Sequence, residues 1–162
     1  MIILGIDPGL ASIGYGLISI ADDERMFLLD YGVISTSVKK EHAERLRQIY
    51  DEITEIIKKY KPDVVAIETI FYSRNLKSLV QVSEAIGVIT LAAGNFGLCI
   101  KKFTPLEVKS AVVRSCRADK RQIQLMVKTL LNLDSLPEPD HASDALATAI
   151  CYNSKTSIVS QA

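Results

Sequence analysis

The feature that most constrains the fold is a short apolar segment that ends in an acidic residue. Residues 64–67 are Val-Val-Ala-Ile, and Glu68 follows them directly. A continuous apolar run of this length predicts a strand buried on both faces, as in the parallel sheets of α/β proteins. The apolar residues 2–6 repeat the pattern, because Asp7 follows them. An ionisable side chain at the end of a buried strand is costly to desolvate unless it is paired or binds a metal.

Helical and extended patterns alternate over the rest of the chain. Leucine and isoleucine recur at helical spacing from residue 41 to residue 60, and Lys-Pro-Asp at 61–63 ends that helix. Strands are expected at residues 2–6, 13–20, 26–36, 64–67 and 98–103, and helices at 41–60, 78–97, 120–133 and 140–152, with another opening at Thr104-Pro105. This order predicts an α/β fold with a central five-stranded mixed sheet flanked by helices on both faces.

The composition is that of a folded chain. The 162 residues are 48% hydrophobic and 23% charged, which argues against disorder, and we expect residues 1–155 to form one domain and the polar residues 156–162 to fray. The apolar start is too short for a signal peptide and no run is long enough to cross a bilayer, so a cytoplasmic protein is expected. Cys99, Cys116 and Cys151 lack CxxC spacing, which favours ordinary thiols over a zinc site or a disulfide.

The charge of the chain is unevenly distributed. The formal net charge is zero, but residues 101–128 contain eight bases and only two acids, a local charge of +6. A basic tract beside an acidic centre is what a nuclease requires, because the bases attract phosphates. A solvated helix face is the alternative explanation for the tract taken alone.

Two further ionisable residues near the end of the chain are candidates for the same site as Asp7 and Glu68. His141 and Asp144 are three residues apart at the start of the last predicted helix, so they share one face. If the strands ending in Asp7 and Glu68 are parallel neighbours, about 4.8 Å apart, their carboxylates converge on one point. Clustered carboxylates favour Mg²⁺ or Mn²⁺, and two such ions can activate water for phosphodiester hydrolysis.

Each of these acids also has a structural explanation when it is taken alone. Asp144 is explained as a charge favoured near a helix start, and Asp140 as an N-cap. Asp7 is explained as a turn former before Pro8-Gly9. Their joint placement is harder to explain in this way and favours a metal site.

Four motifs together identify a family. They are Gly-Ile-Asp-Pro-Gly at residues 5–9, Gly-Tyr-Gly at 14–16, Ala-Ile-Glu at 66–68 and Asp-His-Ala-Ser-Asp-Ala-Leu-Ala at 140–147. In order and spacing they resemble the RuvC family of Holliday-junction resolvases, from Met1 to about Tyr152. The resemblance implies an RNase H-like fold and a Mg²⁺-dependent endonuclease, with two ions and Mn²⁺ as a substitute. It also implies paired symmetric nicks in four-way DNA by a homodimer during recombination and repair, with RuvA and RuvB as partners.

The resemblance implies roles for single residues as well. The metal ligands of the family correspond here to Asp7, Glu68, His141 and Asp144. Many members have aspartate in place of His141; the histidine lowers the negative charge and suits a proton carrier near neutral pH. Lys120 matches a lysine beside the scissile phosphate, Lys109 one that contacts DNA, and Phe71 an aromatic residue that stacks on a base of the opened junction.

The basic loop departs from the family pattern. Relatives usually carry glycines where this chain has residues 113–117, and side chains there narrow the permitted backbone. Arg114, Arg117 and Arg121 are candidates for additional phosphate contacts. Asp140 is interpreted as a cap or a group supporting the site rather than as a direct metal ligand.

Three other functions share parts of this pattern. Actin-like sugar kinases and ATPases have a similar first turn, but they are much longer chains with a second domain. A junction-binding relative without catalysis and an RNase H-like nuclease acting on RNA remain alternatives. Two active sites acting as a pair require a twofold dimer, and residues 78–96 are the candidate dimer surface.

Overall fold

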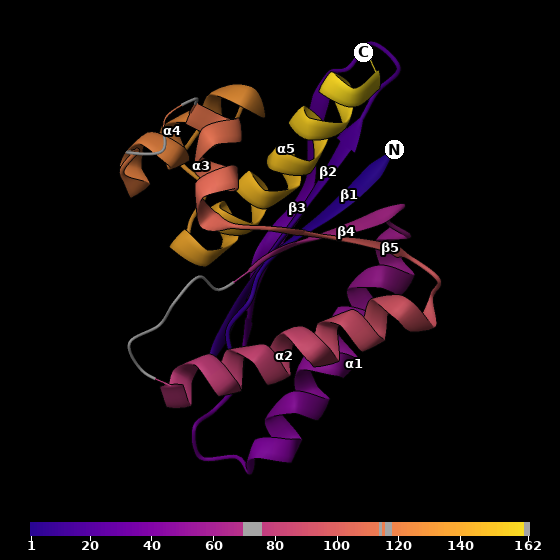
Figure 1. The fold of residues 1–162 in the computed structure, drawn as a ribbon, viewed down its shortest axis with the longest axis vertical. Coiled ribbons are helices and arrows are strands. Elements are labelled where there is room, and N and C mark those ends of the chain that lie inside the picture. Colours follow the sequence, from indigo (N-terminus) through magenta and orange to yellow (C-terminus); the bar gives the residue numbers. More distant parts are fainter. Residues whose placement is uncertain (70–75, 114, 116–117, 161–162) are drawn as a thin grey trace.

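A mixed five-stranded sheet forms the centre of the computed structural model, which describes residues 1–69, 76–113, 115 and 118–160 (Figure 1). The strands are β1 (Ile2–Asp7), β2 (Ser12–Ile20), β3 (Met26–Ser35), β4 (Val64–Glu68) and β5 (Cys99–Phe103), in the spatial order β3-β2-β1-β4-β5. The pairs β1–β2 and β2–β3 are antiparallel, whereas β1–β4 and β4–β5 are parallel. The predicted five-stranded mixed sheet is confirmed, and the two strands that end in acids are parallel neighbours, which is the condition for their carboxylates to converge.

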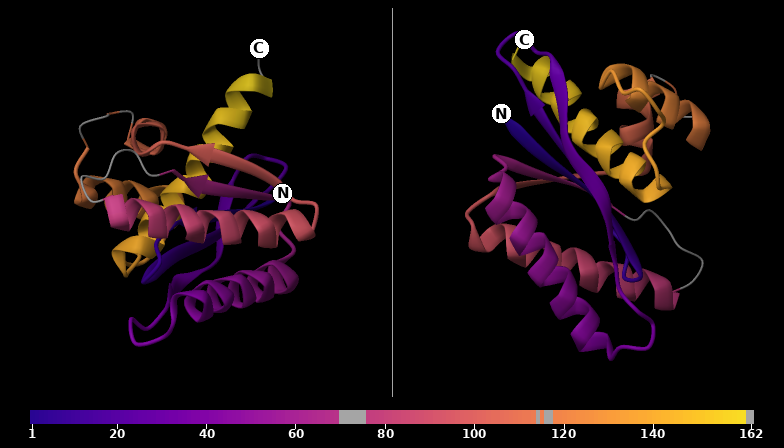
Figure 2. Two further views of the ribbon diagram at one scale, coloured as in Figure 1. Left: turned by 60° about the horizontal axis from the view of Figure 1, so that its bottom comes forward. Right: turned by 180° about the vertical axis from the view of Figure 1, so that it is seen from behind.

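Helices cover both faces of the sheet, as predicted (Figures 1 and 2). The helices α1 (His42–Tyr60) and α2 (Leu76–Asn95) cover one face, and α3 (Pro105–Val113), α4 (Lys120–Leu130) and α5 (Asp140–Ser160) cover the other. Successive residues of a strand point to opposite faces, so each strand contributes to two cores. Ile3 packs with Leu146 of α5 in one core, whereas Leu4 packs with Ile53 of α1 and Ile89 of α2 in the other.

Glycines let α5 lie directly on the sheet. A Cβ atom built on Gly5 of β1 would lie well under 3.0 Å from the backbone of Ala145, and one on Gly14 of β2 would lie equally close to that of His141. The first turns of α5 therefore contact the strands without intervening side chains. The glycine motifs thus place His141 and Asp144 beside the end of β1.

The structure differs from the prediction at helix ends. The last helix continues to Ser160, beyond the end at residue 152 that the sequence predicts. Two contacts support this extension, because Lys155 forms an ion pair with Glu107 of α3 and the Thr156 hydroxyl donates to the Tyr152 carbonyl oxygen at 3.0 Å. The helix α4 ends at Leu130, not at residue 133, because Asn132 adopts a left-handed conformation with a φ of 49°.

No helix within the described ranges is both long and apolar enough to span a membrane.

Candidate active site

The four predicted ligands line one pocket at the end of the sheet. Its volume is about 340 Å³, and it is lined by Asp7, Pro8, Glu68, Thr69, Pro105, His141 and Asp144. Asp7 is the last residue of β1 and Glu68 the last residue of β4, and the register pairs Ile6 with Ile67 directly before them. The structure thus brings the two strand-end carboxylates and the face of α5 together, as the sequence predicts.

Burial makes it costly to ionise the three acids that line this pocket. Burial raises the pKa of Glu68 to about 8, and the nearby charges of Asp7 and Asp144 act in the same direction. The pKa of Asp7 is also raised by burial, although its hydrogen bond with His141 opposes the rise. Burial likewise raises the pKa of Asp144, with Lys120 opposing. Three acids that resist ionisation together require a compensating positive charge.

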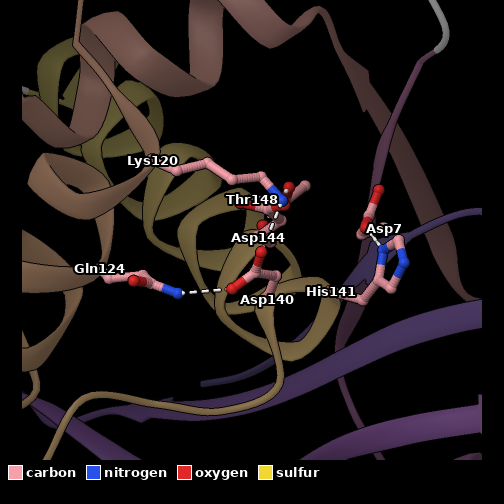
Figure 3. A network of polar contacts seen from close by, with 7 residues as sticks. All are labelled: Asp7, Lys120, Gln124, Asp140, His141, Asp144 and Thr148. Carbon is pink, nitrogen blue, oxygen red and sulfur yellow. Dashed lines mark hydrogen bonds and ion pairs between the residues drawn. The ribbon is translucent and has the colours of Figure 1, made fainter.

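His141 contacts one of these three acids. Its Nδ1 atom lies 2.7 Å from Asp7 Oδ2, and Figure 3 shows the ring turned toward this carboxylate. Asp7 is largely buried, with 18% of its side chain exposed, whereas half of the His141 side chain is exposed. With the side chains in these positions, no group of three or more histidine, cysteine, aspartate or glutamate residues in the described part of the chain is close enough to hold a metal ion. Binding of a cation therefore requires some of these side chains to rotate, and the half-exposed His141 has room to do so.

The predicted phosphate lysine lies at the edge of the pocket. Lys120, the first residue of α4, has its Nζ atom 3.6 Å from Asp144 Oδ2 and 3.0 Å from Asp140 Oδ2. The Nε2 atom of Gln124 donates to the other oxygen of Asp140 at 2.9 Å. Lys120 is therefore held by two carboxylates of α5 (Figure 3).

The second predicted lysine lies in an adjoining pocket. Lys109 of α3 and Lys120 both line a pocket of about 210 Å³, together with Glu68 and Asp144. Because the two pockets share these two carboxylates, the basic groups lie directly beside the acidic ones. This is the juxtaposition that the uneven charge of the sequence predicts.

Of the remaining predicted residues, Arg121 lies in the described part of the chain. Arg121 is exposed next to Lys120 at the start of α4. Phe71, Arg114 and Arg117 lie outside the described residues. Sequence reasoning missed Gln124, and the only signal for it is its spacing of four residues from Lys120, which places both on one face of α4.

A mixed five-stranded sheet covered on both faces, with an acidic pocket where β1 and β4 end, defines the class of protein as a nuclease with the RNase H-like fold. The family profile described as crossover junction endodeoxyribonuclease RuvC matches residues 3–152. The chain belongs to the RuvC family, as its motifs predict.

Individual relatives agree with this assignment. The crossover junction endodeoxyribonuclease RuvC of Alkaliphilus oremlandii is 53% identical over 152 residues, which cover 94% of this chain and 92% of the relative. The enzyme of the same name from Caldanaerobacter subterraneus subsp. tengcongensis is 46% identical over the same shares of both chains. The solved structure of Thermus thermophilus RuvC in complex with a Holliday junction substrate superimposes with a TM-score of 0.90 at 29% identity, covering 98% of this chain and 96% of the other. The predicted fold and enzyme class, an endonuclease, are therefore confirmed.

Proposed function

We propose that this chain resolves Holliday junctions by hydrolysing one phosphodiester bond in each of two opposite strands of four-way DNA. The observation that carries the proposal is the single pocket in which groups from β1, β4 and α5 meet beside Lys120. The names of the relatives and the substrate in the T. thermophilus complex supply the identity of the DNA. Hydrolysis of this kind leaves 5′-phosphate and 3′-hydroxyl ends.

The proposal includes a divalent cation. Asp7, Glu68, His141 and Asp144 would hold it, and oxygen donors with one imidazole suit Mg²⁺, with Mn²⁺ as a substitute. The raised pKa of Glu68, about 8, supports the fit, because a cation offsets the mutual repulsion of these desolvated carboxylates. When bound, one or two such ions supply Lewis-acid stabilisation and an activated water.

The protein's own groups bind and orient the DNA. The Lys120 ammonium group lies at the rim of the pocket, where it would stabilise the negative charge that grows on the phosphoryl oxygens. Lys109 and the exposed Arg121 are placed to contact neighbouring phosphates. His141 has a second candidate role, which excludes cation binding by the same nitrogen: it is suited to move a proton at Nδ1 once its contact with Asp7 is released. Base stacking by Phe71 and phosphate contacts by Arg114 and Arg117 remain predictions.

Two symmetric nicks require two active sites, so the proposal includes a homodimer. The α2 surface, with the following residue Phe96, exposes the large apolar side chains of Leu76, Val80, Leu91 and Phe96. Large apolar side chains exposed along one helix are typical of interfaces. We propose that α2 forms the twofold interface. Detection of monomer alone by ultracentrifugation at micromolar concentration, with and without DNA, would contradict it.

By family resemblance, we propose RuvA and RuvB as partners and the cytoplasm as the location.

Cleavage of a synthetic mobile four-way junction tests the function. Wild-type protein and Asp7→Asn are compared with Mg²⁺ and with Mn²⁺, on junction DNA and on structured RNA. Paired, religatable nicks in the junction that are lost in the variant support the proposal. Tight junction binding without cutting would indicate a junction-binding relative without catalysis. Preferential cutting of RNA would indicate an RNase H-like nuclease that acts on RNA.

A further inference from the structure

Asp140 stands at the start of α5 but outside both pockets of the site. Neither the 340 Å³ pocket nor the adjoining one has Asp140 in its lining, although its neighbour His141 lines the first. Its side chain points to α4 instead, where Lys120 Nζ donates to Oδ2 at 3.0 Å and Gln124 Nε2 donates to Oδ1 at 2.9 Å (Figure 3). Both carboxylate oxygens are therefore bound to the helix that carries the phosphate lysine.

The two donors form a clamp on the carboxylate. Lys120 and Gln124 are four residues apart in α4, so their side chains lie on one face of that helix. A carboxylate that accepts one hydrogen bond at each oxygen cannot rotate without losing one of them. Gln124 thus fixes the orientation in which Asp140 receives the ammonium group of Lys120.

Asp140 determines where this ammonium group lies. The lysine is 61% exposed, and a four-carbon stem without partners samples many rotamers. Asp140 and Asp144 hold the Nζ atom from two sides, at 3.0 Å and 3.6 Å. Asp144 lines the acidic pocket and Asp140 does not, so the lysine is held at the pocket's rim.

We infer that Asp140, held by Gln124, is a positioning residue that keeps the Lys120 ammonium group beside the phosphate to be cut. The inference rests on the proposed function, since Lys120 acts on that phosphate only if the pocket hydrolyses DNA. The competing role for Asp140 is structural: it would only join α4 to the start of α5 and favour the helix start by its charge.

Single-turnover cleavage with saturating protein separates these roles. Asp140→Asn keeps the size of the side chain but removes the charge, and Glu55→Gln is the matched control, because Glu55 forms an exposed ion pair with Lys58 at 2.8 Å on α1. Loss of a charge-stabilising group costs about 10²–10³-fold in rate, so misplacement of Lys120 in Asp140→Asn should cost roughly tenfold. The junction Kd should change by less than about twofold, as expected for loss of a transition-state interaction alone. A variant that cuts at the wild-type rate would overturn the inference.

A double-mutant cycle tests whether Asp140 acts through Lys120. In a Lys120→Ala background, Asp140→Asn should have no further effect on the cleavage rate, because no ammonium group remains to be positioned. Gln124→Ala should slow cleavage in the same direction as Asp140→Asn, and this effect should also vanish without Lys120. A full tenfold effect of Asp140→Asn in the Lys120→Ala background would show a purely structural role and overturn the inference.

A measurement without metal or DNA keeps the inference separate from the proposed function. Hydrogen exchange broadens the ¹⁵N signal of a lysine ammonium group, and a stable ion pair sharpens the signal by slowing this exchange. The Lys120 signal should be sharp in wild type and in Glu55→Gln and much broader in Asp140→Asn, where only Asp144, at 3.6 Å, remains to hold the group. If it persists unchanged in Asp140→Asn, Asp140 does not position the lysine. If it behaves as expected but wild type cuts no junction, the proposed function fails while the positioning of Lys120 stands.

Discussion

Gly14 of β2 and His141 of α5 are in backbone contact, and a Cβ atom on Gly14 would overlap the carbonyl group of His141. The residue that carries one predicted ligand is therefore seated directly on the strand beside Asp7, which pairs with Gly14 in the sheet register. Gly14→Ala should force α5 away from the sheet and cost about 3 kcal/mol or more of the free energy of unfolding. Denaturation in urea measures this loss, and junction cleavage should fall with it.

The matched control for this glycine lies in α2. A Cβ atom on Gly94 meets no atom within 4 Å, and alanine is favoured over glycine inside a helix. At the same protein concentration, Gly94→Ala should leave the free energy of unfolding unchanged or raise it by up to about 1 kcal/mol. Equal destabilisation by both substitutions would mean that the close approach of α5 is not what requires Gly14.

Glu68→Gln should reduce the amount by which cation binding stabilises the fold. The amide keeps the shape of the side chain but removes one of three neighbouring desolvated acids, so the cation-free variant should be at least as stable as wild type. Saturation with Mg²⁺ or Mn²⁺ at a hundred times the Kd should stabilise wild type by about 2.7 kcal/mol, and the variant much less. Thermal unfolding in EDTA and in each cation provides the comparison, with Glu55→Gln as the control. Equal stabilisation of wild type and Glu68→Gln would remove Glu68 from the cation site.

The sequence predicts the residues at the centre of the candidate site because each of them is placed by a pattern of neighbouring residues. Apolar runs that end in Asp7 and Glu68 predict buried strands, and their parallel pairing is enough to bring the two acids to one edge. His141 and Asp144 share a helix face by their spacing alone. For this reason the four groups could be chosen before any contact between them was known.

The contacts between helices could not be predicted in the same way. Which side chain of α4 meets Asp140 depends on how α4 and α5 pack, and polar residues such as Gln124 leave no apolar pattern that reports this. The length of α5 was underestimated for a related reason. The polar residues after Tyr152 look like a fraying end, but Lys155 reaches Glu107 of α3, and this long-range partner is invisible to a local pattern.

The Glu107–Lys155 pair should make stability depend on pH. Hydrogen bonds from Lys155 and Thr104 lower the pKa of Glu107 from its ordinary value of 4.5 to about 2. A carboxylate with a lowered pKa stabilises the fold fully above pH 4.5, and this contribution is lost as the pH falls toward 2. Both side chains are about 40% exposed, so Glu107→Gln should cost about 1 kcal/mol or less at neutral pH.

Urea titrations of wild type and Glu107→Gln from pH 7 to pH 3 measure this pH dependence. The difference between the two proteins should be constant down to about pH 4.5 and should shrink below it. A difference that is the same at pH 7 and pH 3 would mean that the charge of Glu107 contributes nothing and that only its packing matters.

Lys109→Ala should weaken junction binding through phosphate contact alone. Lys109 lines the pocket beside Lys120 and Glu68, so its positive charge lies where the DNA backbone would approach the acidic groups. Loss of one phosphate contact should weaken binding of all junction sequences equally and reduce the slope of log K against log salt by about 1. Fluorescence anisotropy from low to moderate salt gives this slope, and Lys58→Ala on the opposite face of the sheet should leave it unchanged. A variant whose affinity drops for some junction sequences only would indicate that Lys109 contacts bases, because contacts to phosphates carry no sequence information directly.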